Sequence, residues 1–133
     1  MKPVFLDTVG LIALWDDTDQ WHSLATSVFA TLLADHRQMI TTTSVLLECG
    51  NAAARQSYRN DVDDLRQRMQ DRQCLIEPSA DDVAQAWSDY RAGLAGNAGI
   101  VDCISFVVMR RLGLREAFTN DRHFKAAGFA NLF

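Results

Sequence analysis

Four acidic residues stand where a folded chain could bring them together to hold a cation. Asp7 and Asp121 each come at the end of a short apolar run, Glu48 lies in an apolar segment, and Asp102 opens another. Several carboxylates in one crevice repel one another unless they are protonated or bridged by cations. Hard oxygen ligands without His or Cys suit Mg²⁺ or Mn²⁺. Such ions activate water and neutralise charge on a phosphate, so hydrolysis of a phosphodiester is the chemistry this set indicates.

Each acid also has a simpler interpretation. Asp102 alone would be a helix cap that favours the helix dipole. Asp7 and Asp121 would be turn residues that bond their own backbone. Glu48 is harder to explain in this way, because position 45, where a capping-box partner would stand, is Val. A carboxylate among apolar neighbours needs a partner or a metal.

The elements that must position these acids alternate between strands and helices. Short apolar runs predict buried strands, and periodic segments between them predict helices. The expected strands are 4–6, 39–42, 74–76 and 117–119, with a possible fifth in 129–133. This order is typical of an α/β fold with a central, mostly parallel sheet of four to five strands flanked by helices. In such a sheet the four acids lie at the carboxyl edge, where ligands bind.

Length and composition favour one ordinary globular domain covering residues 1–133. The 48% hydrophobic and 23% charged content is unexceptional, and no apolar run approaches the length of a membrane span. No signal-peptide pattern opens the chain, so we expect a cytoplasmic protein without membrane attachment. Three cysteines without CxxC spacing predict free thiols rather than disulfides or a zinc site.

The net charge of −4 argues against tight, indiscriminate binding to long duplexes. Eleven of the 13 basic residues are arginines, so a local arginine-lined groove remains possible. Arg110, Arg111 and Arg115 would contact RNA phosphate or an acidic partner, or would form a solvated helix end. Trp21 and Trp87 fall on helical stripes, where packing in the core is the expectation, with stacking on RNA bases as the alternative.

The four acids, with their neighbours, resemble the motifs of the PIN-domain family, and the likeness to its VapC-type toxin ribonucleases covers nearly the whole chain. The motifs appear in order as Phe5-Leu6-Asp7-Thr8, Leu47-Glu48-Cys49-Gly50-Asn51, Val101-Asp102-Cys103-Ile104-Ser105-Phe106 and Thr119-Asn120-Asp121-Arg122-His123-Phe124. Each motif alone is weak. Their order, spacing and placement make the set specific.

The resemblance implies a PIN fold and an endoribonuclease that depends on Mg²⁺ or Mn²⁺ and serves as the toxin of a toxin–antitoxin pair. Asp7, Glu48, Asp102 and Asp121 would be the catalytic, metal-binding acids. The supporting residues would be Thr8, Asn51, Thr119 and Asn120. The implied partners are an RNA substrate, an antitoxin protein and a second copy of the chain in a homodimer. His123 is interpreted as structural or as a support for the site, because the family's chemistry needs no general base.

Three positions depart from the family pattern: Val9 beside the first acid, Val101 before the third and Asn120 before the fourth. They motivate an alternative function, a catalytically weak or inactive PIN-like module that binds RNA or protein. A third hypothesis is a phospho-acceptor signalling domain. That class usually has an acidic pair after its first strand and a lysine after its last main strand, whereas Asp7 stands alone and Lys125 falls beyond Asp121.

Overall fold

A five-stranded parallel sheet forms the centre of the molecule. The computed structural model describes residues 1–133, and its strands run in the order β3-β2-β1-β4-β5. The strands are β1 (Val4–Leu6), β2 (Met39–Thr42), β3 (Leu75–Ile76), β4 (Glu116–Phe118) and β5 (Ala130–Asn131). Phe5 pairs with Ile40 on one side and Ala117 on the other, so β1 is the middle strand. The predicted parallel α/β sheet is confirmed, including the possible last strand.

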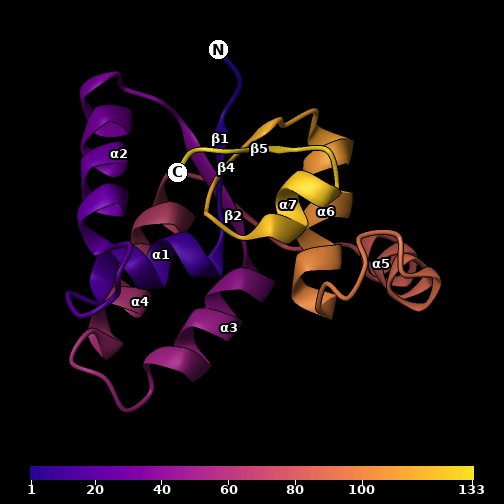
Figure 1. Cartoon of the computed structure of the whole chain (residues 1–133), viewed down its shortest axis with the longest axis horizontal. Coiled ribbons are helices and arrows are strands. Elements are labelled where there is room, and N and C mark those ends of the chain that lie inside the picture. The colour runs from indigo at the N-terminus through magenta and orange to yellow at the C-terminus, as the bar shows by residue number, and fades with distance from the viewer.

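Seven helices cover the sheet. They are α1 (Thr8–Trp15), α2 (His22–Ala34), α3 (Thr43–Ala53), α4 (Arg59–Asp71), α5 (Ala80–Ala92), α6 (Ile100–Leu112) and α7 (Arg122–Ala126). Figure 1 shows α1 and α2 on one side of the strands and α5 and α6 on the other. The first helix begins two residues earlier than the apolar run from Gly10 suggests, because Asp7 caps it directly after β1. None of the helices combines the length and apolarity needed to cross a membrane.

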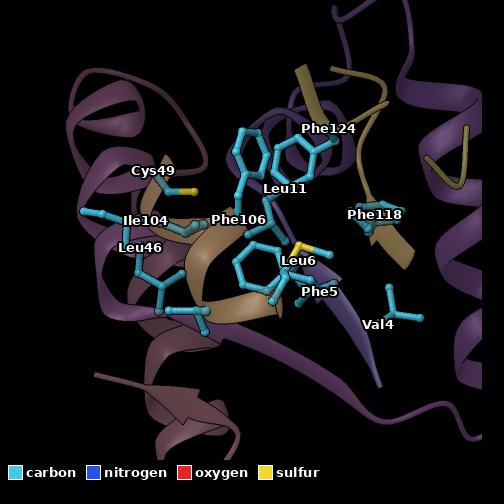
Figure 2. Packing of buried hydrophobic residues seen from close by; sticks show 14 of the residues in the cluster. Val4, Phe5, Leu6, Leu11, Leu46, Cys49, Ile104, Phe106, Phe118 and Phe124 are labelled. Carbon is cyan, nitrogen blue, oxygen red and sulfur yellow. The ribbon is translucent and has the colours of Figure 1, made fainter. Parts of the chain in front are cut away.

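The hydrophobic core lies on both faces of β1. All three of its residues are buried, which requires apolar partners on both sides and explains the unbroken apolar run. The Phe106 and Phe124 rings meet edge to face, with centroids 4.9 Å apart, and Phe5 lies 6.4 Å from Phe124. Figure 2 shows these rings together with Leu11 from α1. The core therefore joins α1, α6 and α7 to the central strand.

Close approach of α1 to β4 depends on Gly10. A Cβ atom at this position would lie 2.0 Å from the Phe118 carbonyl oxygen, a distance that no side chain tolerates. The glycine therefore lets the first turn of α1 lie directly against the end of β4. This contact brings the residues that follow β1 close to those that follow β4.

Helices α5 and α6 form an antiparallel pair locked by a charged contact. Ser79 and Asp82 form a capping box at the start of α5, with each side chain accepting a backbone N–H from the other residue. Arg111 of α6 donates two further hydrogen bonds to Asp82, over 3.0 and 2.8 Å. The arginine at this position therefore binds an acid of its own chain.

Two tryptophans expected in the core lie on the surface. Trp21 is 41% exposed and Trp87 is 52% exposed. Helical periodicity predicts which residues share a face, but it does not say how much of that face another element covers. In α2 only Ala25 and Leu32 are fully buried, and in α5 only Asp82 and Ala86 are. The apolar faces of α2 and α5 therefore extend beyond the area that neighbouring elements cover.

Candidate metal centre

Asp7 is buried at the carboxyl end of β1 with half of its carboxylate unpaired. Its Oδ2 accepts a hydrogen bond from the Val9 N–H over 3.3 Å and one from the Thr119 hydroxyl over 2.8 Å. Its Oδ1 is buried and has no hydrogen-bond partner. A buried, unsatisfied carboxylate oxygen is costly unless something binds it. Val9 itself is partly exposed and contributes through its backbone, so its apolar side chain removes no bond from Asp7.

The segment after β4 supplies Asp121 and connects it to Asp7. The Thr119 hydroxyl that donates to Asp7 also accepts the Asp121 N–H over 3.0 Å. Asp121 caps α7 by accepting the His123 N–H, and its carbonyl accepts Asn131 Nδ2–H over 3.0 Å. One hydroxyl therefore links the ends of the two neighbouring strands.

Asp102 reaches the same place from α6. It is the third residue of that helix, whose cap is Gly99 without a side-chain bond, so the simple capping role is wrong for Asp102. Asp102, Asp121 and His123 each offer a ligand atom, and these atoms lie within 4.8 Å of one another. Asp102 thus meets Asp121 and His123, which come from a later segment of the chain, at the carboxyl edge of the sheet.

Glu48 lies at the border of this group. It is half-buried on α3 and lines a hollow of about 310 Å³ with Asn51 and Val101. Its negative charge contributes to raising the pKa of Asp102, which places the two acids within electrostatic reach. Glu48 is not part of the three-residue group around His123.

Two of the four acids, Asp7 and Asp102, have raised pKa values. Burial, followed by repulsion from Asp102, raises the pKa of Asp7 to about 8, against an opposing hydrogen bond from Thr119. Burial, followed by repulsion from Asp121 and Glu48, raises the pKa of Asp102 to about 7. No lysine or arginine forms an ion pair with any of the four acids; the ion pairs there involve His123 alone. Such a site lacks positive charge.

These residues fit a hard divalent cation. Two carboxylates with strongly raised pKa values would be ionised by a nearby cation, and the unpaired Oδ1 of Asp7 offers it a ligand. Carboxylate oxygens suit Mg²⁺ or Mn²⁺. The metal centre expected from the sequence is therefore compatible with the geometry.

The four residues expected to support the site differ in their surroundings. Thr119 bonds Asp7 directly. The Thr8 hydroxyl and the Asn120 Nδ2 are buried without hydrogen-bond partners. Asn51 is exposed beside the hollow that Glu48 lines.

Sequence reasoning left one contact of the site unrecognised. His123 Nε2 lies 2.7 Å from Asn97 Oδ1, which belongs to the loop between α5 and α6. His123 itself, two residues after Asp121, was interpreted from the sequence as structural or as a support for the site. Nothing in the sequence points to Asn97, which stands in a run of small residues.

Comparisons with known proteins agree with this architecture. The family model described as PIN domain matches residues 4–130. The structure is similar to that of VapC20 from Mycobacterium tuberculosis, described as a sarcin–ricin loop cleaving toxin, with a TM-score of 0.83, 26% identity and 96% of each chain covered. It also shares its fold with FitAcB from Neisseria gonorrhoeae, with a TM-score of 0.65 and 14% identity over 98% of this chain and 96% of that one. The search of curated proteins found no match. Because the family model spans nearly the whole chain and the predicted motifs lie on the expected elements, this chain belongs to the PIN domain family.

Proposed function

We propose that this protein is an endoribonuclease dependent on Mg²⁺ or Mn²⁺ and the toxin of a toxin–antitoxin pair. Family membership and the likeness to VapC20, which is described as a cleaving toxin, support the reaction class. The observation that carries the proposal is the convergence of buried and half-buried acids without lysine or arginine partners, with Asp7 Oδ1 left unpaired.

In this proposal Asp7, Glu48, Asp102 and Asp121 hold the cation. When bound, the cation supplies an activated water and neutralises charge on the RNA phosphate. Asp7 contributes its free Oδ1, while Thr119 and the Val9 N–H fix the other oxygen. Thr8, Asn51 and Asn120 support the site from its border.

Two protein partners belong to the proposal, an antitoxin and a second copy of the chain. Large apolar side chains on the surface of α5 and the following loop support such contacts. Trp87 is 52% exposed, Tyr90 49% and Leu94 67%. Surfaces of this kind in soluble proteins commonly mark interaction sites. Light scattering of the purified chain, alone and with an antitoxin, measures both associations.

Cleavage of RNA by the purified protein tests the function. The substrates include a sarcin–ricin loop oligonucleotide, because VapC20 is described as cleaving that loop. We expect cleavage with Mg²⁺ or Mn²⁺, none with excess EDTA, and losses of about 10²–10⁴-fold in Asp7→Asn and Asp102→Asn. Asp17→Asn is the matched control, because Asp17 is exposed and forms no side-chain hydrogen bond.

Circular dichroism of each variant establishes that it is folded. Retained cleavage in both site variants would refute the assignment of the acids. A wild-type protein that binds these RNAs but cleaves none of them with either metal would favour the alternative, a binding module without catalysis.

A further inference from the structure

We propose that His123 is a direct metal ligand through its Nδ1 atom, and that this nitrogen makes the site prefer Mn²⁺ to Mg²⁺. The inference rests on the proposed metal centre and adds a ligand to it.

The outer nitrogen of the ring is held by Asn97. His123 Nε2 lies 2.7 Å from Asn97 Oδ1, and an amide oxygen can only accept a hydrogen bond, so Nε2 carries the hydrogen. Metal-binding histidines almost always donate their second N–H to a carbonyl, a carboxylate or water, which fixes the ring and its tautomer. Asn97 performs this function from a loop that lies 26 residues away in the sequence.

The inner nitrogen faces the acids. Nδ1 lies 2.7 Å from Asp121 Oδ1, a hydrogen bond in which the two atoms share a proton in the metal-free protein, and 4.0 Å from Asp102 Oδ2. A cation bound here would displace that proton to solvent and take its place between the two atoms. The three side chains are only 16–20% exposed, so their ligand atoms meet in a largely enclosed place. Nδ1 is therefore the ring atom that points at the proposed cation.

The three ligand atoms are close enough to share one ion. They lie within 4.8 Å of one another, a span comparable to the distance of about 4.2 Å between opposite ligands of an ion with bonds of about 2.1 Å.

An imidazole nitrogen among carboxylate ligands changes which metal ion the site binds more tightly. Mg²⁺ takes oxygen ligands almost exclusively, whereas affinity for nitrogen rises along the transition-metal series that begins with Mn²⁺. Two carboxylates with one imidazole should therefore bind Mn²⁺ more tightly than Mg²⁺. Removing the imidazole should reduce Mn²⁺ affinity more than Mg²⁺ affinity.

Pulsed electron paramagnetic resonance of the Mn²⁺-loaded protein tests the ligand directly, because a bound imidazole nitrogen modulates the echo of the manganese electron spin. We expect this nitrogen signal in the wild type and its loss in His123→Gln. The control is His36→Asn, which should keep the signal. His36 is exposed with a φ of 53°, and Asn tolerates that backbone conformation well.

Calorimetry with Mn²⁺ and with Mg²⁺ gives the second readout. In His123→Gln the ratio of the two affinities should fall by at least about tenfold. Asn97→Ala should weaken Mn²⁺ binding by about 10–100-fold while keeping the nitrogen signal, and Asn97→Asp should restore the affinity because it retains the acceptor oxygen.

The failures of the two proposals are distinguishable. Mn²⁺ bound by the wild type without a nitrogen signal, or with a signal that persists in His123→Gln, would overturn the role of His123 and leave the acidic site standing. A wild-type protein that binds no Mn²⁺ at all would overturn both.

Discussion

The Thr119 hydroxyl donates a hydrogen bond to Asp7 Oδ2 over 2.8 Å, joining residues 112 positions apart. The same hydroxyl accepts the Asp121 N–H over 3.0 Å. Thr119 therefore orients the first acid and fixes the backbone of the fourth at once. It leaves Asp7 Oδ1 as the oxygen available to a cation.

Thr119→Val should shift metal binding to higher pH. The hydroxyl stabilises the ionised form of Asp7 and lowers its pKa against burial. A hydrogen bond to a charged group contributes about 1.5–3 kcal/mol, so its loss should raise the midpoint of Mn²⁺ binding by about one pH unit or more. Calorimetric titration from pH 6 to 9 measures this. Thr119→Ser keeps the hydroxyl and should behave like the wild type; an unchanged midpoint in the valine variant would contradict the role of the bond.

The metal-free protein should lose stability as pH rises from about 4 to about 8. The folded-state pKa of Asp7 is about 8 and that of Asp102 about 7, both above the ordinary value of 3.8. The folded chain therefore binds more protons than the unfolded chain in this interval, and the free energy of unfolding falls with rising pH. Above the folded-state values the loss is complete. Urea unfolding in EDTA at pH 5 and pH 8 measures the difference.

Asp7→Asn should remove a large part of this pH dependence. Asn also caps helices well, so the first turn of α1 should be preserved. We expect the variant to exceed the wild type in metal-free stability at pH 8 by an amount on the order of a few kcal/mol, and to differ little near pH 4. Equal slopes for the two proteins would show that Asp7 is not the titrating group.

Gly10→Ala should destabilise the fold strongly. The new Cβ would lie 2.0 Å from the Phe118 carbonyl oxygen, so α1 and β4 would have to separate. We expect a loss of more than about 3 kcal/mol in the free energy of unfolding. Gly50→Ala is the matched control within α3, where a Cβ meets nothing within 4 Å. It should stabilise by about 0.5–1 kcal/mol, and equal effects of the two changes would contradict the close approach.

Arg111→Met should affect stability without affecting RNA cleavage. Arg111 donates two hydrogen bonds to the buried Asp82 and lowers its pKa. We expect a loss of about 1–2 kcal/mol at pH 7, which vanishes as pH falls through the folded-state pKa of Asp82. Arg115→Met should change stability by less than about 0.5 kcal/mol, because Arg115 is exposed and its side chain forms no hydrogen bond. A fall in RNA cleavage by Arg111→Met with unchanged stability would support contact with phosphate instead.

The strands, and the places of Asp7 and Asp121 at strand ends, could be predicted because their signals are local. An apolar run such as Val4–Leu6 reports burial on both faces, and an acid that follows it must lie at the carboxyl edge of a parallel sheet. The order of the strands and the convergence of Asp102 with Asp121 then follow from topology rather than from any single residue.

The remaining contacts depend on how far neighbouring elements extend over one another. The pairing of His123 with Asn97 requires the α5–α6 loop to reach α7, which no sequence period encodes. The exposure of Trp87 depends in the same way on where the cover provided by α6 ends. Arg111 could not be told from a solvated arginine until its partner Asp82 was placed across the helix pair.

Anomalous diffraction from crystals soaked in Mn²⁺ would locate the ion itself and so decide whether the four acids bind it. We expect one strong peak at the carboxyl edge of the sheet, in contact with Asp7, Glu48, Asp102 and Asp121. A peak elsewhere on the molecule, or none under conditions in which the protein cleaves RNA, would contradict it.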